Sequence, residues 1–160
     1  MPRVISNMFT GAKYFQGDMS KWDVSRVMDM NSMFWGAKSF NGDLSKWDTS
    51  SAQDINSMFW SAKLFNGDIS KWDVSSVTDM SYFLYGAVGF TQELCTGGWA
   101  NSKAEKRFMF EFSSGSISPT GCTVTISPPA FSPQSRKELK SAVDAYLRLS
   151  PKGQGTHGPH

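Results

Sequence analysis

The chain has 160 residues, of which 39% are hydrophobic and 14% aromatic, so it can form a sizeable core and is too apolar for wholesale disorder. Its 16 basic and 14 acidic residues are interleaved and give a net charge of +2, which offers no electrostatic reason to expect nucleic acid or an anionic membrane as a partner. No apolar run approaches the ~18 residues of a membrane helix, and the N-terminal residues lack the apolar region of a signal peptide.

A block of the form Phe-(Asn/Gln)-Gly-Asp-(Met/Leu/Ile)-Ser-Lys-Trp-Asp recurs every 25 residues, with its tryptophans at Trp22, Trp47 and Trp72. A period of this length indicates a solenoid, in which each coil buries its apolar face against its neighbours. Residues 5–9 correspond to residues 30–34, in the middle of the next repeat. We therefore expect the uncovered first coil to be preceded by missing sequence or covered by a neighbouring chain.

Each coil is predicted to hold a short strand followed by a short helix. Trp72 and Val74 alternate as they would in a strand, and Met80, Phe83 and Leu84 then follow the spacing of a helical face. The predicted fold class is an α/β repeat solenoid of the leucine-rich-repeat type. Parallel strands would line its concave side and helices its convex side.

The expected domain organisation has four parts. Residues 1–112 would form four to five coils, the last of them distorted, and residues 113–131 an irregular cap or linker with one short strand. Capping-box spacing and an apolar face predict an amphipathic C-terminal α-helix over residues 132–150. The tail at residues 151–160, rich in Gly, Pro and His, is predicted to be flexible.

Residues 72–90 read Trp-Asp-Val-Ser-x-Val-Thr-Asp-Met-x-x-Phe-Leu-x-Gly-Ala-x-x-Phe. This pattern resembles the BspA-like leucine-rich-repeat surface proteins, in particular the uncharacterised repeats of bacterial lipoproteins and algal proteins, and it covers about residues 5–90. The resemblance implies a surface-associated interaction module for adhesion or protein binding, and it supplies no catalytic residues. It favours a secreted or cell-surface location over an organelle or an intracellular assembly.

Charged residues recur in register and are predicted to form a ladder on the concave side. The ladder consists of Lys21, Asp23, Lys46, Asp48, Lys71 and Asp73. It is either a polar ligand groove or a solvated face whose lysines relieve the repulsion between stacked aspartates.

A second set of aspartates, each preceded by glycine, consists of Asp18, Asp43 and Asp68. One Asn and one Asp per coil do not supply the 6–8 oxygens that calcium requires, so we expect these carboxylates to hold turns instead.

Trp35, Trp60 and Tyr85 directly follow the inward Met-Phe pairs or their equivalent. They are predicted to form an aromatic row on the convex side. An exposed row of this kind indicates either a partner site or stacking between coils that lysine stems partly cover.

Cys95 and Cys122 are the only cysteines. They are either joined in a disulfide that staples the end of the array or present as two free buried thiols.

The sequence predicts no catalytic residue, metal site or cofactor, since its only histidines, His157 and His160, lie in the tail without a fixed acid or nucleophile nearby. We therefore expect a non-enzymatic protein-binding or adhesion-type repeat module with a protein partner. The alternatives are a structural subunit packed within a large multi-protein assembly and a carbohydrate-binding surface.

Overall fold

The computed structural model describes residues 3–95 and 97–118. All described residues belong to one compact unit, Met1–Thr123. The helix predicted at residues 132–150, the tail at 151–160 and most of the cap predicted at 113–131 lie outside the described residues.

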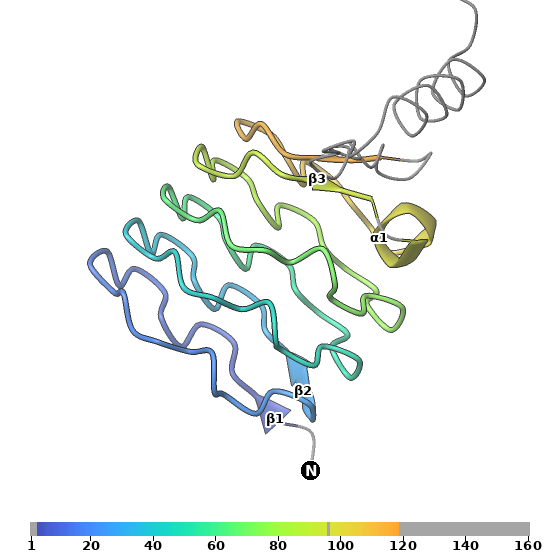
Figure 1. The fold of residues 1–160 in the computed structure, drawn as a ribbon, viewed down its shortest axis with the longest axis horizontal. Coiled ribbons are helices and arrows are strands. Elements are labelled where there is room, and N and C mark those ends of the chain that lie inside the picture. The colour runs from blue at the N-terminus through green and yellow to red at the C-terminus, as the bar shows by residue number, and fades with distance from the viewer. Residues whose placement is uncertain (1–2, 96, 119–160) are drawn as a thin grey trace, which may run out of the picture. The chain divides into compact units, whose positions relative to one another are not determined.

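Successive 25-residue segments of the described chain lie side by side and are joined through their backbones (Figure 1). Asn7 N–H donates to the Asn31 carbonyl at 2.9 Å, and Ser32 N–H donates to the Asn56 carbonyl at the same distance. Parallel bridges connect the same position of four segments; these are Asp29, Asp54, Asp79 and Glu105. The sequence repeat is therefore also the repeat of the hydrogen-bond pattern.

The predicted α/β solenoid of the leucine-rich-repeat type is wrong, because neither a strand nor a helix recurs in each repeat of the described chain. Strands β1 (Arg3–Val4) and β2 (Val27–Asp29) form one two-stranded parallel sheet. Strands β3 (Glu93–Leu94) and β4 (Ser116–Ile117) form another. The single helix among the described residues, α1 (Gly97–Asn101), has five residues.

The predicted helix over Met80, Phe83 and Leu84 is replaced by a chain of tight turns. Tyr82 and Gly86 have φ of +57° and +66°, in the left-handed region that a right-handed helix excludes. Backbone N–H groups alternate between two acceptors: Phe83 donates to Met80 within its own turn, whereas Leu84 donates to Met109 of the next segment at 2.9 Å. The spacing of three and four thus reflects turns and not helical periodicity.

The predicted strand at Trp72 and Val74 is also absent from the described structure. Trp72 N–H donates to the Ile69 carbonyl at 3.1 Å, which closes a turn, and the parallel pairing lies instead at Asp79. Both side chains are nevertheless buried, at 2% and 1% exposed, because the turn also directs them inward.

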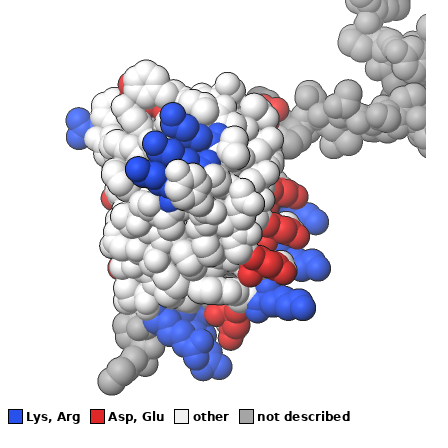
Figure 2. Space-filling model, turned by 90° about the vertical axis from the view of Figure 1, so that its left-hand side faces the viewer, with Lys and Arg blue, Asp and Glu red and all other residues white. Residues whose placement is uncertain are grey.

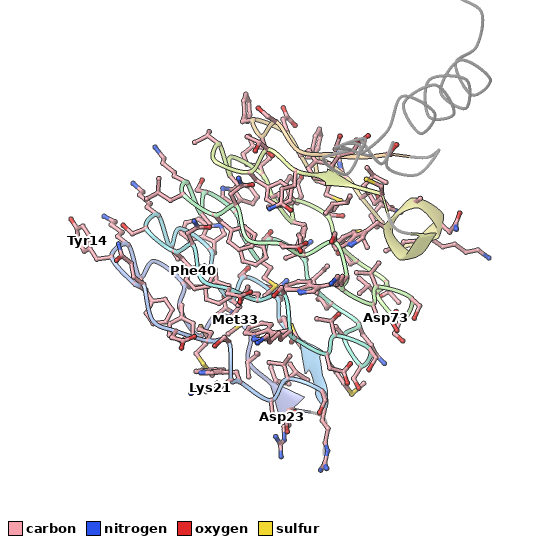
Figure 3. All side chains as sticks on the ribbon, in the orientation of Figure 1. Tyr14, Lys21, Asp23, Met33, Phe40 and Asp73 are labelled. Carbon is pink, nitrogen blue, oxygen red and sulfur yellow. The ribbon has the colours of Figure 1, made fainter. Side chains whose placement is uncertain are left out.

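Phenylalanines stack in two columns through the interior. The rings of Phe34 and Phe59 are 5.5 Å apart, those of Phe40 and Phe65 are 6.0 Å apart, and Phe34 and Phe40 bridge the columns at 4.0 Å. Figure 3 shows Met33 and Phe40 directed into the interior, whereas Tyr14, Asp23 and Asp73 lie at the margins. These buried columns hold the surface positions of each segment in register with the next.

Candidate interaction site

The structure brings the predicted aromatic row together. The ring centroids of Trp35 and Trp60 are 6.5 Å apart, and those of Trp60 and Tyr85 are 4.5 Å apart. Trp35 is 42% exposed, while Trp60 and Tyr85 are half-buried. The row therefore combines contact between neighbouring segments, as one reading of the sequence predicted, with an accessible surface.

Three further aromatic residues, which the sequence reasoning missed, extend this row. Tyr82 stacks on Trp60 at 5.1 Å and contacts Phe108 at 5.4 Å, while Phe112 meets Tyr85 edge-on at 5.3 Å. We call the whole set the aromatic strip; it consists of Trp35, Trp60, Tyr82, Tyr85, Phe108 and Phe112. Phe108 and Phe112 lie 26 residues after Tyr82 and Gly86, and this step in the sequence was the signal that could have placed them in the aromatic strip.

The three added residues all have strained backbones. Tyr82, Phe108 and Phe112 have φ of +57°, +54° and +59°, respectively. The equivalent positions in other segments hold residues that tolerate this region better, such as Ser32, or that adopt it freely, such as Gly36. A residue with a Cβ costs about 1–2 kcal/mol there relative to glycine, and Ser32 and Ser57 share this cost with Tyr82 and Phe108. The other segments therefore form the same turns without an aromatic side chain at these positions.

A guanidinium group adds positive charge to one end of the strip. The Arg107 guanidinium carbon lies 5.2 Å from the centroid of the Phe108 ring, a distance that permits a cation–π interaction. Phe108 and Phe112 are 45% and 65% exposed, and Arg107 is also exposed. The strip thus presents aromatic and cationic chemistry together to solvent.

The predicted charged ladder is exposed, and its aspartates are engaged in local turns. The Ser50 hydroxyl and N–H both donate to the Asp48 carboxylate, at 2.6 and 3.1 Å. Asp23 is held in the same way by Ser25, and Asp73 by the Ser75 N–H. The hydroxyl bond, followed by the backbone bond, holds the pKa of Asp48 below its ordinary value.

The lysines of this ladder, Lys21, Lys46 and Lys71, are exposed beside the aspartates. Figure 2 shows acidic and basic side chains in adjoining rows along one margin of the molecule. Because the carboxylates accept bonds from their own turns, the ladder is better explained as turn chemistry on a solvated face than as a ligand groove.

The second aspartate set also holds turns, as the sequence reasoning expected. Ser20 N–H donates to Asp18 at 2.9 Å, Ser45 N–H to Asp43 at 3.0 Å, and Ser70 N–H to Asp68 at 2.9 Å. Among the described residues, no three His, Cys, Asp or Glu side chains come together as a metal ion would require.

A third aspartate column, at the bridge positions, was not singled out from the sequence. Asn56 N–H donates to Asp54 at 2.8 Å, and the Asn56 side-chain amide donates to Asp79 at 3.1 Å. Burial, followed by repulsion from Asp29 and Asp79, raises the pKa of Asp54 above its ordinary value. Asn56 therefore links the carboxylates of Asp54 and Asp79 through its backbone N–H and its side-chain amide.

Cys95 is buried, at 8% exposed, and follows directly after β3. The described residues contain no free cysteine. Cys122 lies outside the described residues, so its pairing with Cys95 stays a prediction. In the part of the chain that the structure describes, no helix has the length and apolar character needed to cross a membrane.

The described chain is thus a protein of stacked repeats that displays an exposed aromatic surface. The family described as "Mycoplasma protein of unknown function, DUF285" matches residues 3–116, and the chain belongs to this family. No curated protein and no solved structure matches the chain significantly.

Proposed function

We propose that the chain is a non-enzymatic protein-binding module, exposed at the cell surface or secreted, and that the aromatic strip is its partner-binding surface. The observation that carries the proposal is the placement of Tyr82, Phe108 and Phe112 at left-handed positions where other segments use Ser, Asn or Gly. Since the other segments close the same turns without an aromatic ring, the rings at these positions point to a role outside folding.

The chemistry of the strip favours a protein partner over a carbohydrate. Trp, Tyr and Arg contribute most of the binding energy in protein interfaces; the strip contains Trp and Tyr, and Arg107 lies against Phe108 at one end of it. The Trp60 ring lies against both Tyr82 and Tyr85, so much of its face is already in contact with other rings. A sugar-binding surface needs free ring faces. The exposed edges and ends of this strip are therefore better suited to contact the side chains of a protein partner.

The experiment replaces strip residues with residues that other segments of the same chain have at the equivalent positions. In one variant, three strip residues receive the residue found at the same position of another segment: Trp35→Thr, Tyr82→Ser and Phe112→Gly. The control is Tyr14→Ser, which removes an aromatic ring that is 88% exposed and outside the strip, and which copies Ser39. All proteins are immobilised at equal density, and bound proteins from native extract are quantified together with binding to a glycan array.

We expect partners of the wild type to be retained by Tyr14→Ser and lost by the triple variant, which should still unfold cooperatively because each new residue is one that another segment has at that position. Unchanged protein partners in the triple variant would remove the strip from consideration. Glycan binding that disappears with the strip, without any protein partner, would favour the carbohydrate alternative.

A further inference from the structure

A second set of lysines recurs at the 25-residue step, on the side of the stack where Tyr14 lies (Figure 3). We call this set the lysine row; it consists of Lys13, Lys38 and Lys63, all of them exposed. The backbone holds the row in register, since Ser39 N–H donates to the Lys13 carbonyl at 3.0 Å and Leu64 N–H to the Lys38 carbonyl at 3.1 Å. Neighbouring hydrogen-bonded chains lie about 4.8 Å apart, so three positive charges follow one another closely along the stack.

The lysine row lacks the acidic neighbours of the other repeated lysines. Hydrogen bonds from the turn serines, followed by the charges of Lys21, Lys46 and Lys71, lower the pKa values of Asp18, Asp43 and Asp68. In contrast, no Asp or Glu lies within two residues of a lysine of the row. Within the described chain, the ammonium groups of the row make no hydrogen bond or ion pair. Figure 2 shows basic side chains grouped on this face, apart from the margin where acidic and basic rows adjoin.

Folding does not explain the lysine row. Like charges at neighbouring positions of hydrogen-bonded chains repel one another, so the row opposes the stacking of the segments. Val88 occupies the same position of the next segment, where Gly89 N–H still donates to the Lys63 carbonyl at 2.9 Å. The turn therefore forms without a lysine, and the unneutralised charge is available to a ligand.

The lysine row runs alongside the aromatic strip. Lys38 follows Trp35 by three residues, and Lys63 follows Trp60 by the same step. Three residues span at most about 11 Å of backbone, so one segment of a partner can contact both surfaces.

A hollow of about 470 Å³ opens beside the row and is lined by Gln16, Ser39, Asn41, Gly42 and Leu64. The Asn41 side-chain oxygen accepts the Asn66 N–H at 2.8 Å, which leaves the Asn41 amide N–H groups as donors. In the described part of the chain, the Ser39 hydroxyl and the Gln16 amide also make no hydrogen bond. The hollow thus offers unpaired donors next to positive charge, and this combination suits a carboxylate.

We propose that the partner binds through an acidic peptide segment, whose carboxylates lie on the lysine row and in the adjoining hollow. The inference rests on the proposed function, since apolar side chains of the same partner would contact the aromatic strip. An extended peptide places side chains on one face about 6.6–6.8 Å apart, and flexible lysine stems accommodate the difference from the segment spacing. Polymers of phosphate or sulfate groups fit less well, because the row contains no arginine to bind such groups through two hydrogen bonds.

The test applies the full chain to an array of immobilised peptides of random sequence, with heparin and single-stranded DNA as further probes. The lysine-row variant combines Lys13→Gln, Lys38→Gln and Lys63→Gln, which removes the charges and keeps most of each stem. The control combines Lys21→Gln, Lys46→Gln and Lys71→Gln, which removes the same charge from the lysines beside the aspartates. Wild type is also measured at low and high salt, which tests the role of charge without any substitution.

We expect the peptides that bind wild type to be enriched in Asp and Glu. Their affinity should fall about tenfold in the lysine-row variant and at high salt, and stay close to wild type in the control. Bound peptides without acidic enrichment, or equal losses in the two variants, would overturn the inference. Binding of heparin or DNA that depends on the row, without binding of acidic peptides, would overturn it in favour of another polyanion.

The strip variant with Trp35→Thr, Tyr82→Ser and Phe112→Gly separates this inference from the proposed function. Peptides that lack acidic enrichment but are lost by the strip variant would remove the lysine row and leave the strip as the binding surface. Acidic peptides that bind the strip variant but not the lysine-row variant would support the row and overturn the role of the strip.

Discussion

The indole N–H of Trp72 donates to the carbonyl of Leu44 at 3.0 Å and so joins one segment to the segment before it. Trp47 and Trp99 make the same bond to Met19 and Ile69, at 2.9 and 3.1 Å. Trp99 does so although two extra residues separate it from Leu94, compared with Leu44 and Trp47. The tryptophans thus act as repeated links along the stack, including its irregular end.

Trp72→Phe should lower the free energy of unfolding by about 1–3 kcal/mol, since it removes a buried hydrogen bond and leaves part of the indole volume empty. Urea unfolding followed by circular dichroism measures the change. Trp22→Phe is the matched control, because Trp22 is half exposed and makes no such bond to a described residue. Equal losses in the two variants would contradict a linking role for the indole N–H.

Gly36→Ala should destabilise the protein by about 1 kcal/mol, because φ at Gly36 is +68° and an alanine there is strained. An added Cβ would lie 3.8 Å from Gly11 Cα, so the expected loss is conformational and not steric. Phe112→Gly, at the equivalent position, should leave stability unchanged or raise it by up to about 1 kcal/mol. A clear loss of stability in Phe112→Gly would show that the fold needs this ring, and would weaken the case for the aromatic strip.

Asp54→Asn should stabilise the protein at neutral pH, by roughly 0.5 kcal/mol or less because the carboxyl is partly exposed. The pKa of Asp54 is raised in the folded protein, so its favourable contribution is complete below the ordinary Asp range and is lost as pH rises through the folded pKa. Asn keeps an oxygen to accept the Asn56 N–H and removes the repulsion from Asp29 and Asp79. The gain should therefore shrink on acidification, as measured by urea unfolding at several pH values.

Asp48→Asn is the control, for which we expect an effect on stability of the opposite sign. The Ser50 bonds lower the pKa of Asp48, so its contribution is present above the ordinary Asp range and is lost as pH falls through the folded pKa. This variant should be less stable than wild type at neutral pH and approach it in acid. The same pH trend in both variants would contradict the assigned causes.

The repeat in the sequence was sufficient to predict which residues meet, but not the backbone that brings them together. Burial of Trp47 and Trp72 and the row of Trp35, Trp60 and Tyr85 follow from the 25-residue register alone. The predicted strand and helix failed because inward residues at spacings of two, three and four also fit tight turns. Left-handed serines such as Ser57 gave no sequence signal for those turns, since serine lacks the strong left-handed preference of glycine.

The Cys95–Cys122 pair should resist alkylation in the native protein without reductant and react after denaturation with reductant, as read by intact mass. Cys95 is buried and sits directly after β3, where a link to the following segment would close a loop and limit the unfolded chain. By loop entropy such a link contributes about 3 kcal/mol, so reduction or a Cys122→Ser variant should lower the urea midpoint. Cys95→Ser is the matching control for Cys122→Ser. The double variant should lose no more stability towards urea than either single variant, because each of the three variants removes the same disulfide bond. Two alkylated thiols in the denatured protein before any reductant is added would show free cysteines and would argue against the secreted or surface location.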